Sequence, residues 1–199
     1  MRSSSSRSPQ TRPATLDDLL AIPEDDRFHE ILDGELVEKE ATSGQHSLPH
    51  GEALIHLAPY RGKPNGPSRP GGWWLVPEPT IQITPHQIVR PDLAGWRRER
   101  MPDPPAGYPV LLRPDWVCEI HFKKDARRRD TLQKRRIYAD AGVPFFWLID
   151  AAAQTLTVLK LVEGVMVDLQ HAGIKDPPLS AEPFPAAPIP VPMHMVTKP

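Results

Sequence analysis

Hydrophobic and polar positions change their period along the chain, from that of a helix to that of a strand. Three segments combine helical spacing with start signals such as the capping residue Thr15 and the first-turn residue Pro49. These signals predict helices over residues 16–22, 49–58 and 126–141. The last predicted helix carries Leu132 and Ile137 on its apolar face and stops at Gly142.

Runs rich in aromatic and β-branched residues predict strands. Two such runs flank Asp33-Gly34, a dipeptide typical of a tight hairpin turn, and two others flank Glu163-Gly164. Residues 145–149 are almost entirely apolar, so we expect this strand at the centre of a sheet. The predicted strands are 28–32, 35–39, 73–76, 80–84, 88–96, 116–122, 145–149, 156–162 and 165–169. This order of elements predicts a mixed α/β (α+β) fold.

Proline and glycine interrupt this pattern and set the expected domain limits. They cluster in residues 59–72 and 101–109, which we expect to form loops. Residues 1–14 begin with an Arg- and Ser-rich stretch and are expected to form a flexible tail. Residues 174–199 are rich in proline, so we expect an extended tail that adds little to the core. The predicted domain is therefore 15–173.

The composition indicates one globular domain. The 199 residues are 39% hydrophobic, and the formal charge of -1 does not by itself call for a nucleic-acid partner. The longest apolar run contains Gly142 and Pro144 and is shorter than the roughly 20 residues that cross a bilayer, so no membrane partner is expected. The single cysteine, Cys118, fits a reducing compartment, which predicts a cytoplasmic location.

The charge is distributed unevenly along the chain. Residues 17–40 hold ten acids and two bases, whereas residues 121–136 hold eight bases and two acids. Positive charge concentrated at the start of one helix can attract phosphate. The bases that we expect to contact nucleic acid are Lys123, Lys124, Arg127, Arg128 and Arg129. The alternative is an ordinary solvated helix face.

Two carboxylates occur within strand-like segments. Asp92 follows a proline in IVRPDLAGW, and Glu119 lies between apolar neighbours in WVCEIHF. Burying a charged group is costly unless it is paired or bound to a metal. Two acids on neighbouring strands can hold Mg²⁺, which binds through one or two carboxylates and keeps several waters. The alternative is that each acid points outward from a half-exposed strand.

Three segments carry a family resemblance because they occur in a characteristic order. They are RPDLAGWRRERMP, RPDWVCEI and RRRDTLQKRRIYADAGVPFFWLID, and the N-terminal FHEILDGELVE and the pair His50-Gly51 are consistent with them. Together they resemble the PD-(D/E)XK restriction-endonuclease-like superfamily, and most closely its bacterial Uma-type endonuclease branch. The resemblance covers residues 16–162. It implies a restriction-endonuclease-like core, in which helices flank a small mixed β-sheet, with an N-terminal hairpin.

The resemblance also implies a site and a reaction. Asp92 and Glu119 match the two acids that hold a metal, together with the carbonyl of Ile120. The usual strand lysine would fall at position 121, which is His121, and the resemblance implies that Lys134 replaces it. We then expect the Lys134 ammonium to point at both acids. The implied activity is hydrolysis of DNA phosphodiester bonds with Mg²⁺, or with Mn²⁺ in its place.

Three further residues are candidates for the same site. Glu30 could approach the metal from the hairpin, or be a charge on the hairpin face. His50 could contact a phosphate or a carboxylate, or be a surface histidine at a helix start. His121 becomes the expected base if Lys134 points away from the acids.

One departure from the family pattern leaves a second function open. Similar proteins have a small Ser/Thr-containing loop after the second acid, whereas this chain has HFKKD over residues 121–125. The alternative to an endonuclease is therefore a catalytically inactive nucleic-acid-binding or assembly module on the same fold. A third interpretation is an interaction protein that recruits partners through its proline-rich tail. DNA is the expected partner, and a homodimer is an open alternative.

Overall fold

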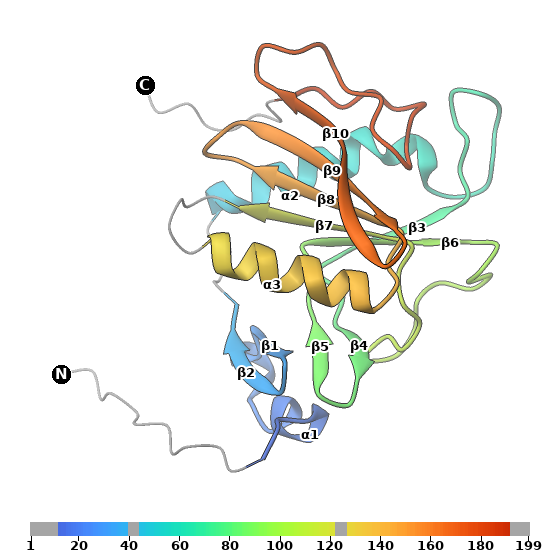
Figure 1. The fold of residues 1–199 in the computed structure, drawn as a ribbon. Coiled ribbons are helices and arrows are strands. Elements are labelled where there is room, and N and C mark those ends of the chain that lie inside the picture. The colour runs from blue at the N-terminus through green and yellow to red at the C-terminus, as the bar shows by residue number, and fades with distance from the viewer. Residues whose placement is uncertain (1–11, 40–43, 122–126, 192–199) are drawn as a thin grey trace.

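A computed structural model describes residues 12–39, 44–121 and 127–191, with the backbone alone for 44–49 and 127–130 (Figure 1). The expected tail 1–14 lies mostly outside these residues, although Ala14 is already fully buried. No helix within the described ranges is long and apolar enough to cross a membrane.

The chain forms two β-sheets and three α-helices within the described residues. The smaller sheet has the strand order β2-β1-β5-β4, and the larger sheet has the order β10-β9-β8-β7-β6-β3. Strands β7 and β8 are parallel, and the other pairs of the larger sheet are antiparallel. The helices are α1 (Leu16–Leu20), α2 (Gly44–His56) and α3 (Arg127–Asp140), with short 3-10 helices η1 (Glu24–Asp26) and η2 (Ala58–Tyr60).

The strands follow the predicted order with one important difference. They are β1 (His29–Leu32), β2 (Glu35–Glu38), β3 (Trp73–Pro77), β4 (Ile81–Thr84), β5 (Gln87–Val89), β6 (Leu93–Arg97), β7 (Trp116–His121), β8 (Phe145–Asp150), β9 (Thr155–Val162) and β10 (Val165–Gly173). The single strand predicted over 88–96 is wrong. It is divided at Arg90 and Pro91 into β5 and β6, which belong to different sheets, because proline cannot donate to a strand ladder.

The two faces of the larger sheet pack against different elements. On one face, Trp116 and Trp147 pack with α2 and with residues of the C-terminal segment. On the other face, Val117 and Phe146 pack with α3, which Figure 1 shows lying between the two sheets. Because side chains alternate along a strand, Glu119 in β7 shares the α3 face with Val117.

The expected extended tail over 174–199 is wrong as far as residue 191. Phe184 and Ile189 are fully buried, and Leu179 and Ile189 form an isolated antiparallel bridge. Proline has no N–H to satisfy, so this segment can cover the aromatic side chains of the sheet without leaving many unpaired donors. The core therefore extends beyond the predicted domain limit at residue 173.

The helices differ from the prediction at two points. Helix α2 begins at Gly44, five residues before the expected start at Pro49. In α3, Leu132 is 58% exposed, so it does not belong to the buried face, which carries Lys134, Ile137 and Tyr138 instead. The helix thus presents a charged residue to the interior, and this residue is paired there.

Candidate active site

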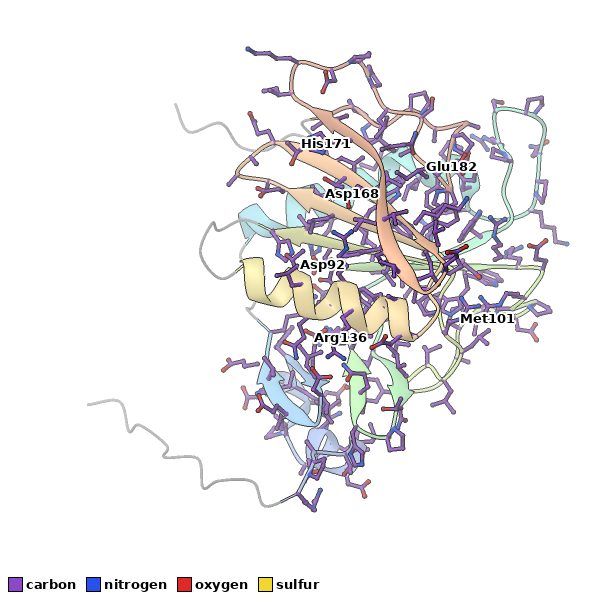
Figure 2. All side chains as sticks on the ribbon, in the orientation of Figure 1. Asp92, Met101, Arg136, Asp168, His171 and Glu182 are labelled. Atoms are coloured by element: carbon purple, nitrogen blue, oxygen red, sulfur yellow. The ribbon has the colours of Figure 1, made fainter. Side chains whose placement is uncertain are left out.

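The two predicted acids lie on neighbouring strands of the larger sheet. Asp92 directly precedes β6, and Glu119 belongs to β7; Leu93 and Cys118, their chain neighbours, are paired across the two strands. The side chains are almost completely buried, at 4% and 2% exposure for the two residues. Figure 2 shows Asp92 at the sheet, beside helix α3.

Lys134 enters this region from α3. Its Nζ lies 3.0 Å from Glu119 Oε1 and 3.0 Å from Glu30 Oε2. Tyr138, one turn further along the same helix face, donates its hydroxyl to Glu119 Oε1 at 2.6 Å. Lys134 itself is 2% exposed, and such burial of an ammonium group requires paired anions.

Glu30 reaches the same cluster from the N-terminal hairpin. Its Oε1 accepts a hydrogen bond from the backbone N–H of Arg90 at 2.6 Å, while its Oε2 pairs with Lys134. The tight turn at Asp33-Gly34 makes this placement possible because it pairs β1 with β2 and exposes the other edge of β1 to β5. The structure therefore brings Glu30 into the cluster.

Asp92 is held by groups from three parts of the chain. Its Oδ1 lies 2.7 Å from Nζ of Lys39, and its Oδ2 accepts the Ile120 N–H at 2.6 Å. Nε2 of His50, in α2, lies 3.7 Å from Oδ1. Lys39 also donates to the carbonyl of Arg90 at 2.6 Å. His50 is thus one of the predicted residues that the structure brings to the cluster.

Burial and neighbouring charges move the pKa values of the two acids in opposite directions. Burial raises the pKa of Glu119 to about 7, against the attraction of Lys134 and Lys39. Burial also acts to raise the pKa of Asp92, but Lys39, His50 and Lys134 together lower it below its usual value. A pair of acids with separated pKa values is typical of functional sites.

Other predicted residues lie elsewhere or cannot be placed. Nε2 of His121 lies 3.0 Å from the Thr131 hydroxyl, and because Lys134 points at Glu119, the condition for His121 to replace Lys134 is not met. Arg135 and Arg136 point away, to Asp168 and Asp33 respectively. Lys123 and Lys124 lie outside the described residues, and Arg127, Arg128 and Arg129 form the start of α3 without described side chains.

Two residues of the cluster were not predicted from the sequence. Tyr138 follows Lys134 by four residues, so helical spacing could have placed it beside the lysine. Lys39 carries no comparable signal, because its partner Asp92 lies 53 positions further along the chain. Only the hairpin and its pairing with β5 bring the two together.

The donor set fits a hard divalent cation. No three His, Cys, Asp or Glu side chains of the described ranges are grouped as a ready metal site. Mg²⁺ needs fewer protein ligands than that, since it usually takes one or two carboxylates and keeps several waters. The two acids on adjacent strands can supply these oxygens, although the Lys39 ammonium contacts Asp92 Oδ1.

Comparisons with known proteins identify the family of this chain and agree with its fold. The model of the Uma2 family, described as "Putative restriction endonuclease", matches residues 16–191, so the chain belongs to this family and the resemblance seen in the sequence is confirmed. A crystal structure titled as a putative nuclease of DUF820 from Anabaena variabilis ATCC 29413 is similar, with a TM-score of 0.64 and 21% identity. The match covers 84% of this chain and 87% of that one, and it confirms the predicted α+β, restriction-endonuclease-like fold. No curated protein matches.

Proposed function

We propose that this chain is a Mg²⁺-dependent endonuclease that hydrolyses DNA phosphodiester bonds. The observation that carries the proposal is the buried ammonium of Lys134, which lies 3.0 Å from both Glu119 and Glu30 beside the second acid, Asp92. Carboxylates can hold the metal ion of phosphoryl chemistry, and a nearby ammonium group can stabilise negative charge on the phosphate. The family description, restriction endonuclease, supports the same activity.

Each residue of the cluster has a proposed task. Asp92 and Glu119 would hold the ion, and the bound ion would lower the pKa of a coordinated water and neutralise charge on the phosphate. The Lys134 ammonium stabilises negative charge on the phosphate oxygens. Tyr138 is a positioning residue, since its hydroxyl fixes Glu119 Oε1 through the 2.6 Å hydrogen bond. Glu30 is a second carboxylate that positions the Lys134 ammonium, through the 3.0 Å contact of its Oε2.

The choice of DNA as substrate rests on charge as well as on the family. Five of the bases of residues 121–136, namely Lys123, Lys124, Arg127, Arg128 and Arg129, occur in the sequence immediately before or at the start of α3, the helix that delivers Lys134. Contacts from such bases to phosphates give affinity that is independent of sequence and falls with salt. Replacing Arg127, Arg128 and Arg129 by Ala should therefore weaken binding to every duplex tested.

The proposed activity is tested by plasmid nicking in Mg²⁺ and in Mn²⁺. We expect wild type and the exposed-surface control Glu99→Gln to nick, and Glu119→Gln and Lys134→Met to lose at least about 100-fold in rate. DNA binding by Glu119→Gln, measured by fluorescence anisotropy in EDTA, should remain at or above the wild-type affinity. Nicking that survives in both cluster variants at the wild-type rate would rule out this site.

One observation favours the alternative of an inactive nucleic-acid-binding module. The contact of Lys39 with Asp92 Oδ1 already supplies a positive charge where the cation has to bind. A purified wild type that binds DNA but cleaves none in either metal would establish this alternative.

A further inference from the structure

A cavity of about 670 Å³ lies next to the charged cluster. Its walls come from the segment before β1, the turn between β3 and β4, and the loop that precedes Val110. This volume falls within the range of small-molecule sites in proteins, roughly 300–1,000 Å³. The cavity is not part of the cluster itself, and none of the proposed metal ligands lines it.

The cavity and the charged cluster are built on the same backbone. Arg90 donates its N–H to Glu30 and accepts from Lys39 through its carbonyl, both at 2.6 Å, while its side chain lines the cavity. Glu78, another lining residue, donates its N–H to the carbonyl of Asp92 at 3.0 Å. The cavity and the charged cluster are therefore joined through the backbone of Glu78, Arg90 and Asp92.

The aromatic side chains of the cavity are unusual in their exposure. Among the Phe, Tyr and Trp side chains that the structure describes, only Phe28 (37%) and Tyr108 (49%) are exposed, and both line this cavity. Each ring is accompanied by a guanidinium group, with Arg90 4.9 Å from the Phe28 centroid and Arg27 5.9 Å from the Tyr108 centroid. Exposed rings with neighbouring guanidinium planes are suited to stacking on a flat ligand.

The charges of the cavity argue against an anion as the ligand. Arg90 is paired with Glu78 at 2.9 Å, and Arg27 donates to the carbonyls of Leu20 and Ile22. Glu24 and Glu78 both line the cavity, so its two arginines are matched by two carboxylates. A free phosphate would meet no unopposed positive charge there. A flat, uncharged ring with amino and carbonyl edges matches both the rings and the mixed polar groups.

We propose that this cavity binds one unstacked nucleobase of the DNA strand whose phosphate enters the charged cluster. The proposal rests on the endonuclease function proposed above for the choice of DNA. Tyr108 and Phe28 stack on the base, and the carboxylate of Glu24 accepts a hydrogen bond from an N–H group at the edge of the base, such as the ring N3–H of thymine. The cluster contacts the backbone of the strand, whereas the cavity contacts a base.

The test compares two single strands of equal length and charge, an oligothymidylate and a strand in which every base is absent. Binding is measured in EDTA by anisotropy for wild type and Tyr108→Leu, with Phe28→Leu as a second variant. We expect Tyr108→Leu to lower affinity for oligothymidylate about tenfold and to leave affinity for the baseless strand unchanged. Tyr108→Phe should bind both strands as wild type does. The control Leu111→Ala removes a 73% exposed side chain outside the cavity and should change neither affinity.

The outcomes separate this proposal from the proposed function. Equal losses on both strands, no loss on either, or a wild type that binds neither strand would overturn the nucleobase cavity. If wild type still nicks plasmid in Mg²⁺ in any of these cases, the proposed endonuclease function is retained without the nucleobase cavity. If Tyr108→Leu loses affinity only for the strand that carries bases, while wild type nicks no plasmid, the nucleobase cavity is supported and the proposed endonuclease function is overturned. Thermal melts of each variant establish that it is folded.

Discussion

Lys39 supplies an ammonium group directly to Asp92, at 2.7 Å from Oδ1, and also contacts the Arg90 carbonyl. A lysine in this position satisfies a buried carboxylate in the absence of any other cation. It also opposes a second cation at the same oxygen, because like charges repel strongly in a weakly screened interior. In the proposed enzyme, metal binding therefore requires the Lys39 ammonium to be displaced from Asp92.

Replacing Lys39 by Met should strengthen metal binding. At an effective dielectric constant of about 20, two unit charges 4 Å apart interact by about 4 kcal/mol, so removing the ammonium should raise Mn²⁺ affinity at least about tenfold. Isothermal titration with Mn²⁺ measures this directly. The exposed residue Lys175 provides the control, since Lys175→Met should leave the affinity unchanged. An unchanged or lower affinity in Lys39→Met would show that the lysine does not compete with the metal.

Metal affinity should also depend on pH through Glu119. Burial raises its pKa to about 7, so the carboxylate is mostly protonated at pH 6 and mostly ionised at pH 8. A metal binds the ionised form, so Mn²⁺ affinity should increase by about tenfold from pH 6 to pH 8. Glu119→Gln should remove this increase while retaining weak binding. A wild-type affinity that is the same at both pH values would contradict the shifted pKa.

At the scale of elements, local signals in the sequence predicted the first hairpin, α3 and the central strand β8, because turn residues, helical spacing and an apolar run are properties of neighbouring residues. The division of residues 88–96 was not predictable in this way. Val89 ends a strand of the smaller sheet and Leu93 begins one of the larger sheet, and only long-range pairing decides this. The order of the motifs located Asp92, Glu119 and Lys134 because each of them lies in one of the quoted segments. Lys39 lies in none of these segments, and its partner Asp92 is 53 positions away, so the motifs missed it.

Gly95, at the centre of strand β6, lies where there is little room for a side chain. A Cβ atom added at Gly95 would lie 3.1 Å from Leu75, Trp73 and Trp116 side-chain atoms. Gly95→Ala should therefore destabilise the protein by about 1–3 kcal/mol through overpacking. Gly51, in α2, has nothing within 4 Å of an added Cβ, so Gly51→Ala should stabilise by up to about 1 kcal/mol. Urea denaturation of both variants measures these opposite changes, and destabilisation by Gly51→Ala would contradict the open space at that site.

At the scale of the whole molecule, the C-terminal segment completes the core. The Phe184 ring makes edge contacts with Tyr60, Trp73, Trp116 and Trp147, at centroid distances of 4.9, 4.8, 5.1 and 5.5 Å. The indole N–H of Trp147 donates to the Glu182 carbonyl at 2.6 Å. This role could not be predicted from composition, because proline-rich segments usually contribute little to a hydrophobic core. The apolar residues of this segment are separated by prolines and show neither helical nor strand periodicity.

Phe184→Ala should reduce the free energy of unfolding by about 3–5 kcal/mol, because it leaves a cavity among four aromatic side chains. Leu111→Ala, at an exposed position, should change it by less than about 0.5 kcal/mol. Chemical denaturation followed by tryptophan fluorescence measures both variants. A decrease in the free energy of unfolding of less than about 1 kcal/mol in Phe184→Ala would contradict a role of the C-terminal segment in the core.

Because Phe184 lies near the end of the chain, the aromatic core of the larger sheet can be completed only late in translation. Trp73, one of its partners, is translated roughly 110 residues earlier, which at about 5–20 residues per second leaves a delay of several seconds or more. During that time the aromatic face of the larger sheet has no cover from this segment. The nascent chain therefore exposes this apolar surface until residue 184 has been added, and a chain in that state is prone to aggregation.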